Sequence, residues 1–475
     1  MFGISRHSAA DLSELYSPRS LQVSLLFLVA LAGVCFAGLT LAGRGSQAQL
    51  LLLAGAGFTL VFFPRAAFYV FLVSLSLYMP HRFSQLIVIY PYDLALGIAF
   101  LAVVMDFLLR VRTQIRPALF DGPFLVLIAA GGISALFAHS PGHCLVPLIR
   151  LVVIFIAFRL VFKFALEIGV RRITLLFIYL VFILALINTL LFFISGGGTR
   201  IFGPSVYGFE TFCVTALNMA LAFLIWSKSP RERRRFGFIA LVIGFGVLAT
   251  QSRAPVLAIV LIIPLLVLFT AVKARREETR LPLRTMKTVF IPLAILLAVF
   301  LFLQNTLLAG SLGRYEQFIL SFSAPRGSVA LRIALWGAAF NAFLDNPITG
   351  LGIGNFKIVH DIYPNLVFDP LWYFVKGLSA HNIFLHHLAE TGLVGLAALL
   401  VLAWRGLRVS YLSFKARLSS ADSQVTAALF IAVLSFVLYM RAWTWGQTGY
   451  IMAILFGLSA AWTYEQRQRV ATSDQ

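Results

Sequence analysis

The sequence predicts an all-α polytopic membrane protein, with about 12–14 transmembrane helices and one long non-cytoplasmic loop that contains short helices. Three observations support this prediction. Hydrophobic residues make up 60% of the 475 positions and charged residues only 12%, and the mean hydropathy is +0.93. The apolar residues lie in unbroken runs, and most charged residues fall between those runs. A soluble core could not bury this much apolar surface.

The apolar runs define the expected helices, because a helix satisfies its own backbone in hydrocarbon and needs about 20 residues to cross it. A transmembrane β-barrel would alternate polar and apolar residues, and these runs do not. We expect spans near 21–42, 47–63, 66–79, 92–109, 121–138, 144–162, 173–195, 210–227, 236–250, 254–272, 288–308, 382–404, 425–440 and 447–463.

Clusters of basic residues give the expected orientation. Arginine and lysine gather after every second span, at 110–116, 163–172, 228–235, 273–287, 405–417 and 467–469. By the positive-inside rule, these segments and both termini lie in the cytoplasm. The net charge of +20 therefore indicates membrane topology, and no nucleic-acid partner is expected.

The first apolar run is expected to stay in the protein, since Asp11 and Glu14 precede it and no small-residue cleavage site follows it. Cys35, Cys144 and Cys213 lack the CxxC spacing of a metal or redox pair, so we treat them as small apolar residues.

The chain divides into three parts on this interpretation. These are transmembrane helices with short loops over 1–308, a non-cytoplasmic loop over 309–381 that caps the site, and C-terminal transmembrane helices over 382–475. The loop is the only long non-cytoplasmic segment, of about 70 residues, and exposed functional groups concentrate in it.

Residues 328–344 of this loop are expected to form a helix that Ser328 can cap and Pro347 ends. Arg332, Trp336 and Phe340 share one face at four-residue spacing. Two interpretations stay open. The helix can be interfacial, with an arginine that reaches the lipid headgroups, or it can present Arg332 to a substrate.

Three glycines follow at alternate positions, Gly350, Gly352 and Gly354. Such a segment can bring backbone N–H groups close to an anion. It is not a nucleotide-binding fingerprint, because no strand precedes it and the Rossmann spacing fails. A plain turn is the alternative.

His381, followed by Asn382, puts a titratable imidazole where an apolar span begins. Neutral imidazole can accept a proton near neutral pH without a metal, so His381 is the candidate base. At about 100° per residue, Glu390 falls on the opposite side of a helix from His381. His386 is four residues before Glu390 and can pair with it. No further ligand completes a zinc site, so no metal is expected. A structural role for His381 is the alternative.

Two more arginines are expected on the non-cytoplasmic side, Arg200 after the seventh span and Arg253 in the corner between the ninth and tenth. Each alone could anchor a lipid headgroup. Together with Arg332, the glycines and His381, they indicate a diphosphate site, because guanidinium binds phosphate bidentately and stays charged.

The order of these pieces resembles the O-antigen ligase and polymerase superfamily of bacterial polysaccharide assembly. The resemblance covers 200–475 by motif and the whole chain by topology. It rests on Thr199-Arg200 through Pro204, Ser252-Arg253, Arg332 through Trp336, Asn346 through Phe356, and His381-Asn382 followed by Gly392-Leu-Val-Gly395.

The resemblance implies a glycosyltransferase of the bacterial inner membrane, active at the periplasmic face, with an undecaprenyl-diphosphate-linked glycan as donor. It implies a catalytic role for His381, with Arg200 and Arg332, and diphosphate binding by those arginines and by Arg253. We expect Gly352 and Gly354 to assist diphosphate binding, and Asn382, Glu390 and Trp336 to support the site. Neither metal nor cofactor is expected. The anomeric configuration should invert, since no carboxylate pair is available for a covalent intermediate.

The acceptor separates the two activities of the superfamily: lipid A core for a ligase, another glycan for a polymerase. Trp336 stands where a ligase-type pattern would have leucine, which favours a polymerase. A protein-glycosylating transferase is a third member of the class, with nothing here that marks a polypeptide groove. The alternative from another class is a flippase or exporter of lipid-linked oligosaccharide. Against it, no inverted repeat is evident and the polar groups crowd one membrane side.

Overall fold

The computed structural model describes ten stretches of the chain: 57–75, 81–82, 88–110, 116–194, 206–250, 253–276, 328–358, 377–416, 420–439 and 447–473. The expected spans at 21–42 and 288–308, and most of the span at 47–63, lie outside these stretches. The chain forms two compact units, one of Met1–Ser74 with Tyr90–Ile115 and one of Leu75–Ile89 with Arg116–Gln475.

The first unit contains α4 (Pro64–Ser74) and α5 (Pro91–Arg110), which pack on each other through small and aromatic side chains. Ala67, Phe68 and Phe71 of α4 and Ala99 of α5 are fully or almost fully buried. α4 has 11 residues, too few to cross a bilayer alone.

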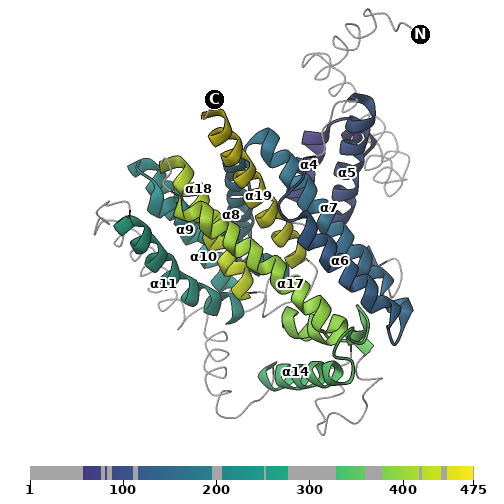
Figure 1. Ribbon diagram of the computed structural model, residues 1–475. Coiled ribbons are helices and arrows are strands. Elements are labelled where there is room, and N and C mark those ends of the chain that lie inside the picture. The colour runs from purple at the N-terminus through teal and green to yellow at the C-terminus, as the bar shows by residue number, and fades with distance from the viewer. Residues whose placement is uncertain are drawn as a thin grey trace, which may run out of the picture. The chain divides into compact units, whose positions relative to one another are not determined.

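The second unit is a bundle of helices (Figure 1). In chain order its elements are β1 (His81–Arg82), β2 (Val88–Ile89), α6 (Asp121–Leu136), η1 (Pro141–His143), α7 (Leu145–Ile168), α8 (Val170–Ile194), α9 (Val206–Trp226), α10 (Pro230–Ala249), α11 (Arg253–Arg276), α14 (Ser328–Asp345), η2 (Asn355–Ile358), α17 (Ile383–Lys415), α18 (Ser420–Tyr439) and α19 (Gln447–Ser473). The two short strands pair antiparallel.

Long apolar helices confirm the prediction of an all-α polytopic membrane protein. In the described stretches, six helices have the length and hydropathy to cross a membrane: Pro91–Leu108, Pro141–Ile168, Val170–Ile194, Phe209–Trp226, Ile383–Lys415 and Asp422–Tyr439. Shorter apolar helices are Pro64–Ser74, Asp121–Leu136 and Leu261–Lys273. The total of 12–14 stays a prediction.

Small residues let the helices of the second unit approach closely. A side chain at Gly457 of α19 would overlap Val161 of α7, and one at Gly246 of α10 would meet Ala185 of α8. Polar contacts join α9 to α18, where Asn218 Nδ2 donates to Ser435 Oγ at 2.9 Å. Close packing at the glycines and the hydrogen bond between α9 and α18 join these neighbouring helices.

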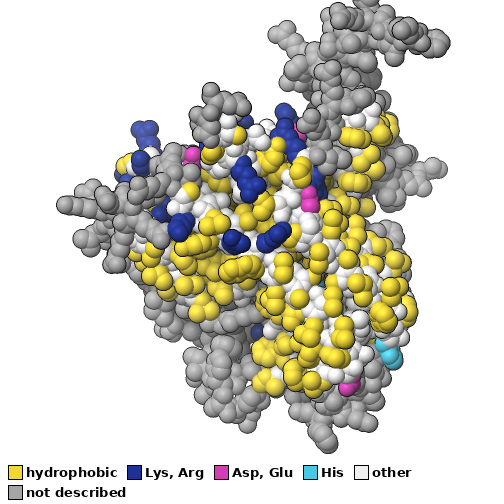
Figure 2. All heavy atoms as spheres, viewed as in Figure 1, with side chains coloured by type: hydrophobic (Ala, Val, Ile, Leu, Met, Phe, Trp, Pro, Cys, Tyr) yellow, Lys and Arg dark blue, Asp and Glu magenta, His cyan; other side chains and the backbone are white. Residues whose placement is uncertain are grey.

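One end of the second unit gathers the starts of α8, α10 and α18 with the end of α19, and we call it the basic end. Arg171 donates to Gln424 at 3.1 Å and lies 3.7 Å from Glu232, and Arg469 lies 3.5 Å from Asp422. Figure 2 shows lysine and arginine side chains concentrated there. This convergence agrees with the alternation of basic loops in the sequence.

An arginine without an obvious partner in the sequence has one in the fold. Arg159, inside α7, pairs with Asp121 at the start of α6, and its Nη1 donates to both carboxylate oxygens, at 3.1 and 2.8 Å. The pair satisfies both charges next to an apolar span.

The opposite end joins the end of α6 and the start of α7 to α14, η2 and the start of α17. Ser134 Oγ donates to the Glu390 carbonyl at 2.6 Å, and the His139 N–H donates to the Leu351 carbonyl at 3.0 Å. α14 lies across the start of α17 (Figure 1). We call this the histidine end, because it carries His381.

Candidate active site

Asn382 sets the point at which α17 begins. Its side-chain oxygen accepts the N–H groups of Phe384 at 3.0 Å and Leu385 at 3.2 Å. Asn382 itself is extended, with φ −155° and ψ 112°, as an N-cap residue should be. His381 is therefore the residue just before the cap, outside the helix.

His381 has a left-handed backbone, with φ 47°. It is the only non-glycine residue with positive φ in the described stretches. This conformation costs a residue with a Cβ roughly 1–2 kcal/mol and persists only where the surroundings enforce it. The left-handed backbone of His381 lies directly before the N-cap of α17.

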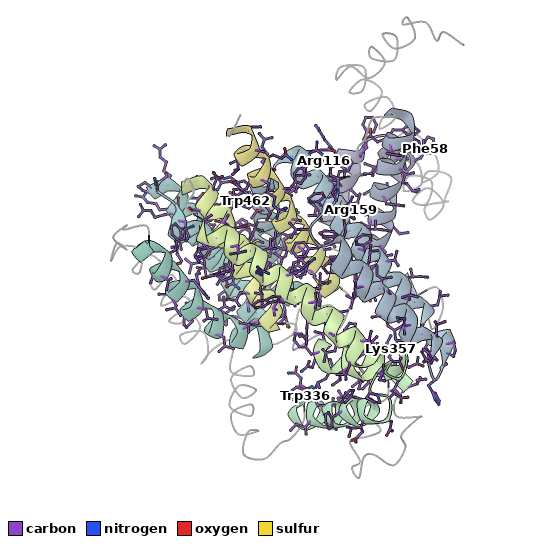
Figure 3. The ribbon with its side chains drawn as sticks, viewed as in Figure 1. Phe58, Arg116, Arg159, Trp336, Lys357 and Trp462 are labelled. Atoms are coloured by element: carbon purple, nitrogen blue, oxygen red, sulfur yellow. The ribbon has the colours of Figure 1, made fainter. Side chains whose placement is uncertain are left out.

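Trp336 connects α14 to this segment. Its indole Nε1 donates to the carbonyl of Ala380 at 3.0 Å, one residue before His381. The buried side chains of Leu335, Ala339 and Ala389 belong to a common apolar cluster beneath this bond. Figure 3 shows Trp336 at the histidine end, away from Arg116 and Arg159.

Arg332 lies one helical turn before Trp336, close enough to His381 for its charge to act on the imidazole. Burial, then the charge of Arg332 and then His386 together lower the pKa of His381 from 6.5 to about 4. His381 is therefore neutral at neutral pH and can accept a proton. The expected shared role of Arg332 and His381 in one site stays a prediction, which this electrostatic effect of Arg332 on His381 supports.

His386 and Glu390, a few residues after His381 in α17, form a buried ion pair or hydrogen bond. His386 Nε2 is 3.3 Å from Glu390 Oε1, and both side chains are buried. The Phe356 ring packs edge-on against His386 at 5.3 Å between ring centres. The Phe356 N–H donates to Glu390 Oε1 at 3.1 Å. The expected pairing of His386 with Glu390 is confirmed.

His387 hydrogen-bonds within its own helix, as expected. Its Nδ1 lies 3.2 Å from Thr391 Oγ1, and the Thr391 hydroxyl donates to the His387 carbonyl at 2.7 Å. In the described stretches, no three histidine, cysteine, aspartate or glutamate residues come together as a metal site would require.

The glycine turn uses its N–H groups within the protein. Gly352 N–H donates to the Glu390 carbonyl at 3.0 Å, and Gly354 N–H is directed to the Glu390 carboxylate. Gly350, Gly352 and Gly354 have φ values of 71°, 101° and 85°, and a Cβ at Gly350 would overlap the backbone of Glu390. A Cβ at Gly352 would overlap Ala138, and one at Gly354 would overlap the His143 carbonyl and Pro147. Close approach to α17 and to the segment that joins α6 to α7 therefore explains the three glycines, and their expected contact with a diphosphate stays a prediction.

Gly392 interrupts α17, with φ 61° and ψ −159°. A Cβ there would overlap the Ile348 carbonyl. The chain resumes as a helix once the Leu393 N–H donates to the Pro347 carbonyl at 2.9 Å. The segment from Ile383 to Thr391 is thus a short helical part of α17 before the break, and it carries His386, His387 and Glu390.

The structure describes only part of the other two predicted arginines, Arg200 and Arg253. Arg200 lies outside the described residues, and Arg253 begins α11 while its side chain lies outside the description. Sequence reasoning missed Lys357, an exposed residue in η2 next to Phe356, whose charge acts on His386 and Glu390 (Figure 3). Its position directly after the glycine turn, in the long non-cytoplasmic segment, was the available signal.

A comparison with known protein families finds a match over the region that carries these residues. A family model described as O-antigen ligase matches residues 237–400. The match includes α14, the glycine turn, η2, His381 and the break at Gly392, and it starts after Arg200. No curated protein matches the sequence significantly.

Proposed function

We propose that this chain, whose residues 237–400 match a family model described as O-antigen ligase, transfers a glycan from an undecaprenyl-diphosphate donor to a hydroxyl acceptor. The family supports a membrane enzyme of glycan transfer in polysaccharide biosynthesis. The lipid-diphosphate donor, the periplasmic side of the bacterial inner membrane and the mechanism are parts of the proposal.

The observation that carries the proposal is the partly buried imidazole of His381, whose pKa is lowered to about 4 by burial and by the charge of Arg332, so that it is neutral at neutral pH. A glycosyl transfer to a hydroxyl needs a base for the acceptor and a cation for the leaving diphosphate. We assign the cation to Arg332 on α14 and the base to His381 before α17, and the bond from Trp336 to Ala380 that joins their segments supports this assignment.

In the proposed step, the acceptor oxygen attacks the anomeric carbon as its proton passes to a ring nitrogen of His381. The bond from the anomeric carbon to the diphosphate oxygen breaks, and its electron pair leaves with the diphosphate. Arg332 stabilises that charge together with Arg200 and Arg253. A single displacement of this kind inverts the anomeric configuration.

The proximity of Arg332 and His381 gives the base a dependence on the donor. In the free protein, burial and then the charge of Arg332 hold the pKa of His381 at about 4. A diphosphate bound to Arg332 offsets that positive charge, so the pKa of His381 rises when the donor is present. The base thus becomes stronger in the complex that needs it.

The experiment is transfer by the purified full-length protein in proteoliposomes, with a polyprenyl-diphosphate glycan and a glycan acceptor. His381→Ala should lower turnover about 100- to 10,000-fold, the usual contribution of a general base. His139→Ala is the matched control, because its exposed side chain lies at the same end of the bundle and only its backbone bonds Leu351. Normal transfer by His381→Ala would refute the proposed base.

The same assay separates the enzyme from the flippase or exporter. A new glycosidic bond identifies a transferase, whereas movement of the donor between leaflets without a new bond identifies a transporter. Acceptor choice then divides the proposal further: lengthening of a lipid-linked glycan identifies a polymerase, and transfer to lipid A core a ligase.

A further inference from the structure

One face of α14 is exposed and entirely apolar. Its large exposed side chains are those of Ile333, Trp336, Phe340 and Leu344, and Ile348 extends the series past the end of the helix. Their exposed fractions run from 38% for Trp336 to 65% for Ile348. We call this set of five residues the α14 stripe.

The helix geometry makes the α14 stripe a continuous surface. At about 100° per residue, its four helical members and Gly337 fall within an arc of about 100°. The buried residues Leu335, Ala339 and Ala342 point the other way, into the cluster beneath His381. α14 has just two charged residues, Arg332 and Asp345, and neither lies in the arc. Contiguous exposed apolar residues on this scale normally meet lipid or protein.

The stripe connects directly to the surface of a membrane span. The carbonyls of Pro347 and Ile348 accept the N–H groups of Leu393 at 2.9 Å and Val394 at 3.4 Å. Leu393 and Val394 follow the break in α17, a helix with the length and hydropathy to cross a membrane, and both are exposed. Exposed apolar side chains therefore continue from α14 through Ile348 to Leu393 and Val394 of α17.

We infer that α14 is a membrane-surface helix, with the α14 stripe inserted into the lipid leaflet at the histidine end. Its orientation across the start of α17 (Figure 1) suits a helix that lies in the plane of a bilayer. Trp336 then occupies the interface, where tryptophan is enriched. Asp345 turns toward water, and the burial of each large apolar side chain in lipid favours this position.

An interfacial position of α14 would also set the level of Arg332 relative to the lipid phosphates. An arginine at the edge of an interfacial helix reaches the phosphate layer of the leaflet. Arg332 lies at such an edge of α14. If the proposed function holds, the diphosphate of a lipid-linked donor sits in that same layer, level with Arg332 and His381.

The test uses adjacent positions on α14 in the full-length protein. Bimane is attached to Leu344→Cys or to Asp345→Cys, each with Cys35→Ser, since Cys144 and Cys213 are buried. The proteins are reconstituted in vesicles of phosphatidylethanolamine and phosphatidylglycerol. One quencher is bromine on the lipid acyl chains, and the other is iodide in the water on both sides.

The label at position 344 should be quenched by bromolipid several-fold more than the label at 345, and iodide should show the reverse order. A label at Ile333→Cys should behave like the one at 344, which guards against a local effect of one substitution. Equal iodide quenching at 344 and 345 would overturn the inference. Protection of position 344 from both quenchers would also overturn it, in favour of a protein cover. Neither readout needs transfer activity, so failure of the proposed function would leave this result intact.

Discussion

Trp336 Nε1 donates a hydrogen bond to the carbonyl oxygen of Ala380 at 3.0 Å, and this bond joins the helix of Arg332 to the residue before His381. Two segments that are far apart in sequence thereby keep a fixed separation between a cation and a base. Catalysis by position depends on such fixed separations, and small displacements are costly.

Trp336→Phe should keep the aromatic packing and remove the bond. Because a net hydrogen bond contributes about 0.5–1.5 kcal/mol, we expect turnover to fall about 2- to 12-fold, with little change in folding yield. Steady-state glycan transfer measures the effect. Phe340→Leu is the control, since it alters an aromatic residue one turn later that makes no such bond. Equal losses in both variants would contradict a specific role for the indole N–H.

Asn382→Ala should loosen the start of α17. The loss of a side-chain N-cap costs about 1 kcal/mol, so the midpoint of thermal unfolding in detergent should fall. Turnover should fall with it, because the cap holds the residue next to His381. Asn382→Ser should retain most of both properties, since serine also caps. An Asn382→Ala protein with unchanged unfolding and turnover would show that the cap is dispensable.

The fall of kcat/KM on the acid side of the pH profile should occur at an unusually low pH. The pKa of His381 is held at about 4 by burial, by Arg332 and by His386, so the base stays neutral until the pH approaches that value. We expect kcat/KM, which reports groups of the free enzyme, to be insensitive to His381 between pH 7 and about 5 and to fall below.

Arg332→Gln should move this acid limb to higher pH. Removal of the positive charge lets the imidazolium form more readily, so the pKa of His381 rises toward its ordinary value. The measurement is kcat/KM against pH for both proteins. A limb that stays in place, or moves to lower pH, would contradict the electrostatic coupling of the two residues.

Two glycines of the same region should respond oppositely to alanine. Gly392→Ala introduces a Cβ at φ 61° that overlaps the Ile348 carbonyl, so the yield of folded protein should drop. Gly337→Ala lies in α14 with no atom near the new Cβ, and the higher helix propensity of alanine should stabilise that helix by up to about 1 kcal/mol. Size-exclusion profiles and thermal unfolding distinguish them. A well-folded Gly392→Ala protein would argue against the break in α17.

The sequence was sufficient for those features that depend on local pattern. Hydropathy located α5 and α8 to within a few residues, because an apolar run of span length has few alternatives to a helix. The helix at 328–344 and the pairing of His386 with Glu390 were also predicted, since cap residues and four-residue spacing are local signals.

Features that depend on distant contacts were not predictable. The N–H groups of Gly352 and Gly354 are directed to Glu390, more than thirty residues later, and no spacing rule in one sequence reveals that. At the break at Gly392, the carbonyls of Pro347 and Ile348 accept the N–H groups of Leu393 and Val394. Arg159 of α7 pairs with Asp121 of α6, 38 residues earlier. The role of Lys357 depends on η2 folding against Phe356 and Glu390, which brings its charge near them.

The central claim is that His381 acts on the acceptor while Arg332 acts on the diphosphate. The most direct measurement compares donor affinity and single-turnover transfer for His381→Ala and Arg332→Gln in proteoliposomes. We predict that His381→Ala binds the polyprenyl-diphosphate glycan normally and transfers it at least about 100-fold more slowly, whereas Arg332→Gln binds the donor less tightly. Transfer by His381→Ala at the rate of the unaltered protein would contradict the account.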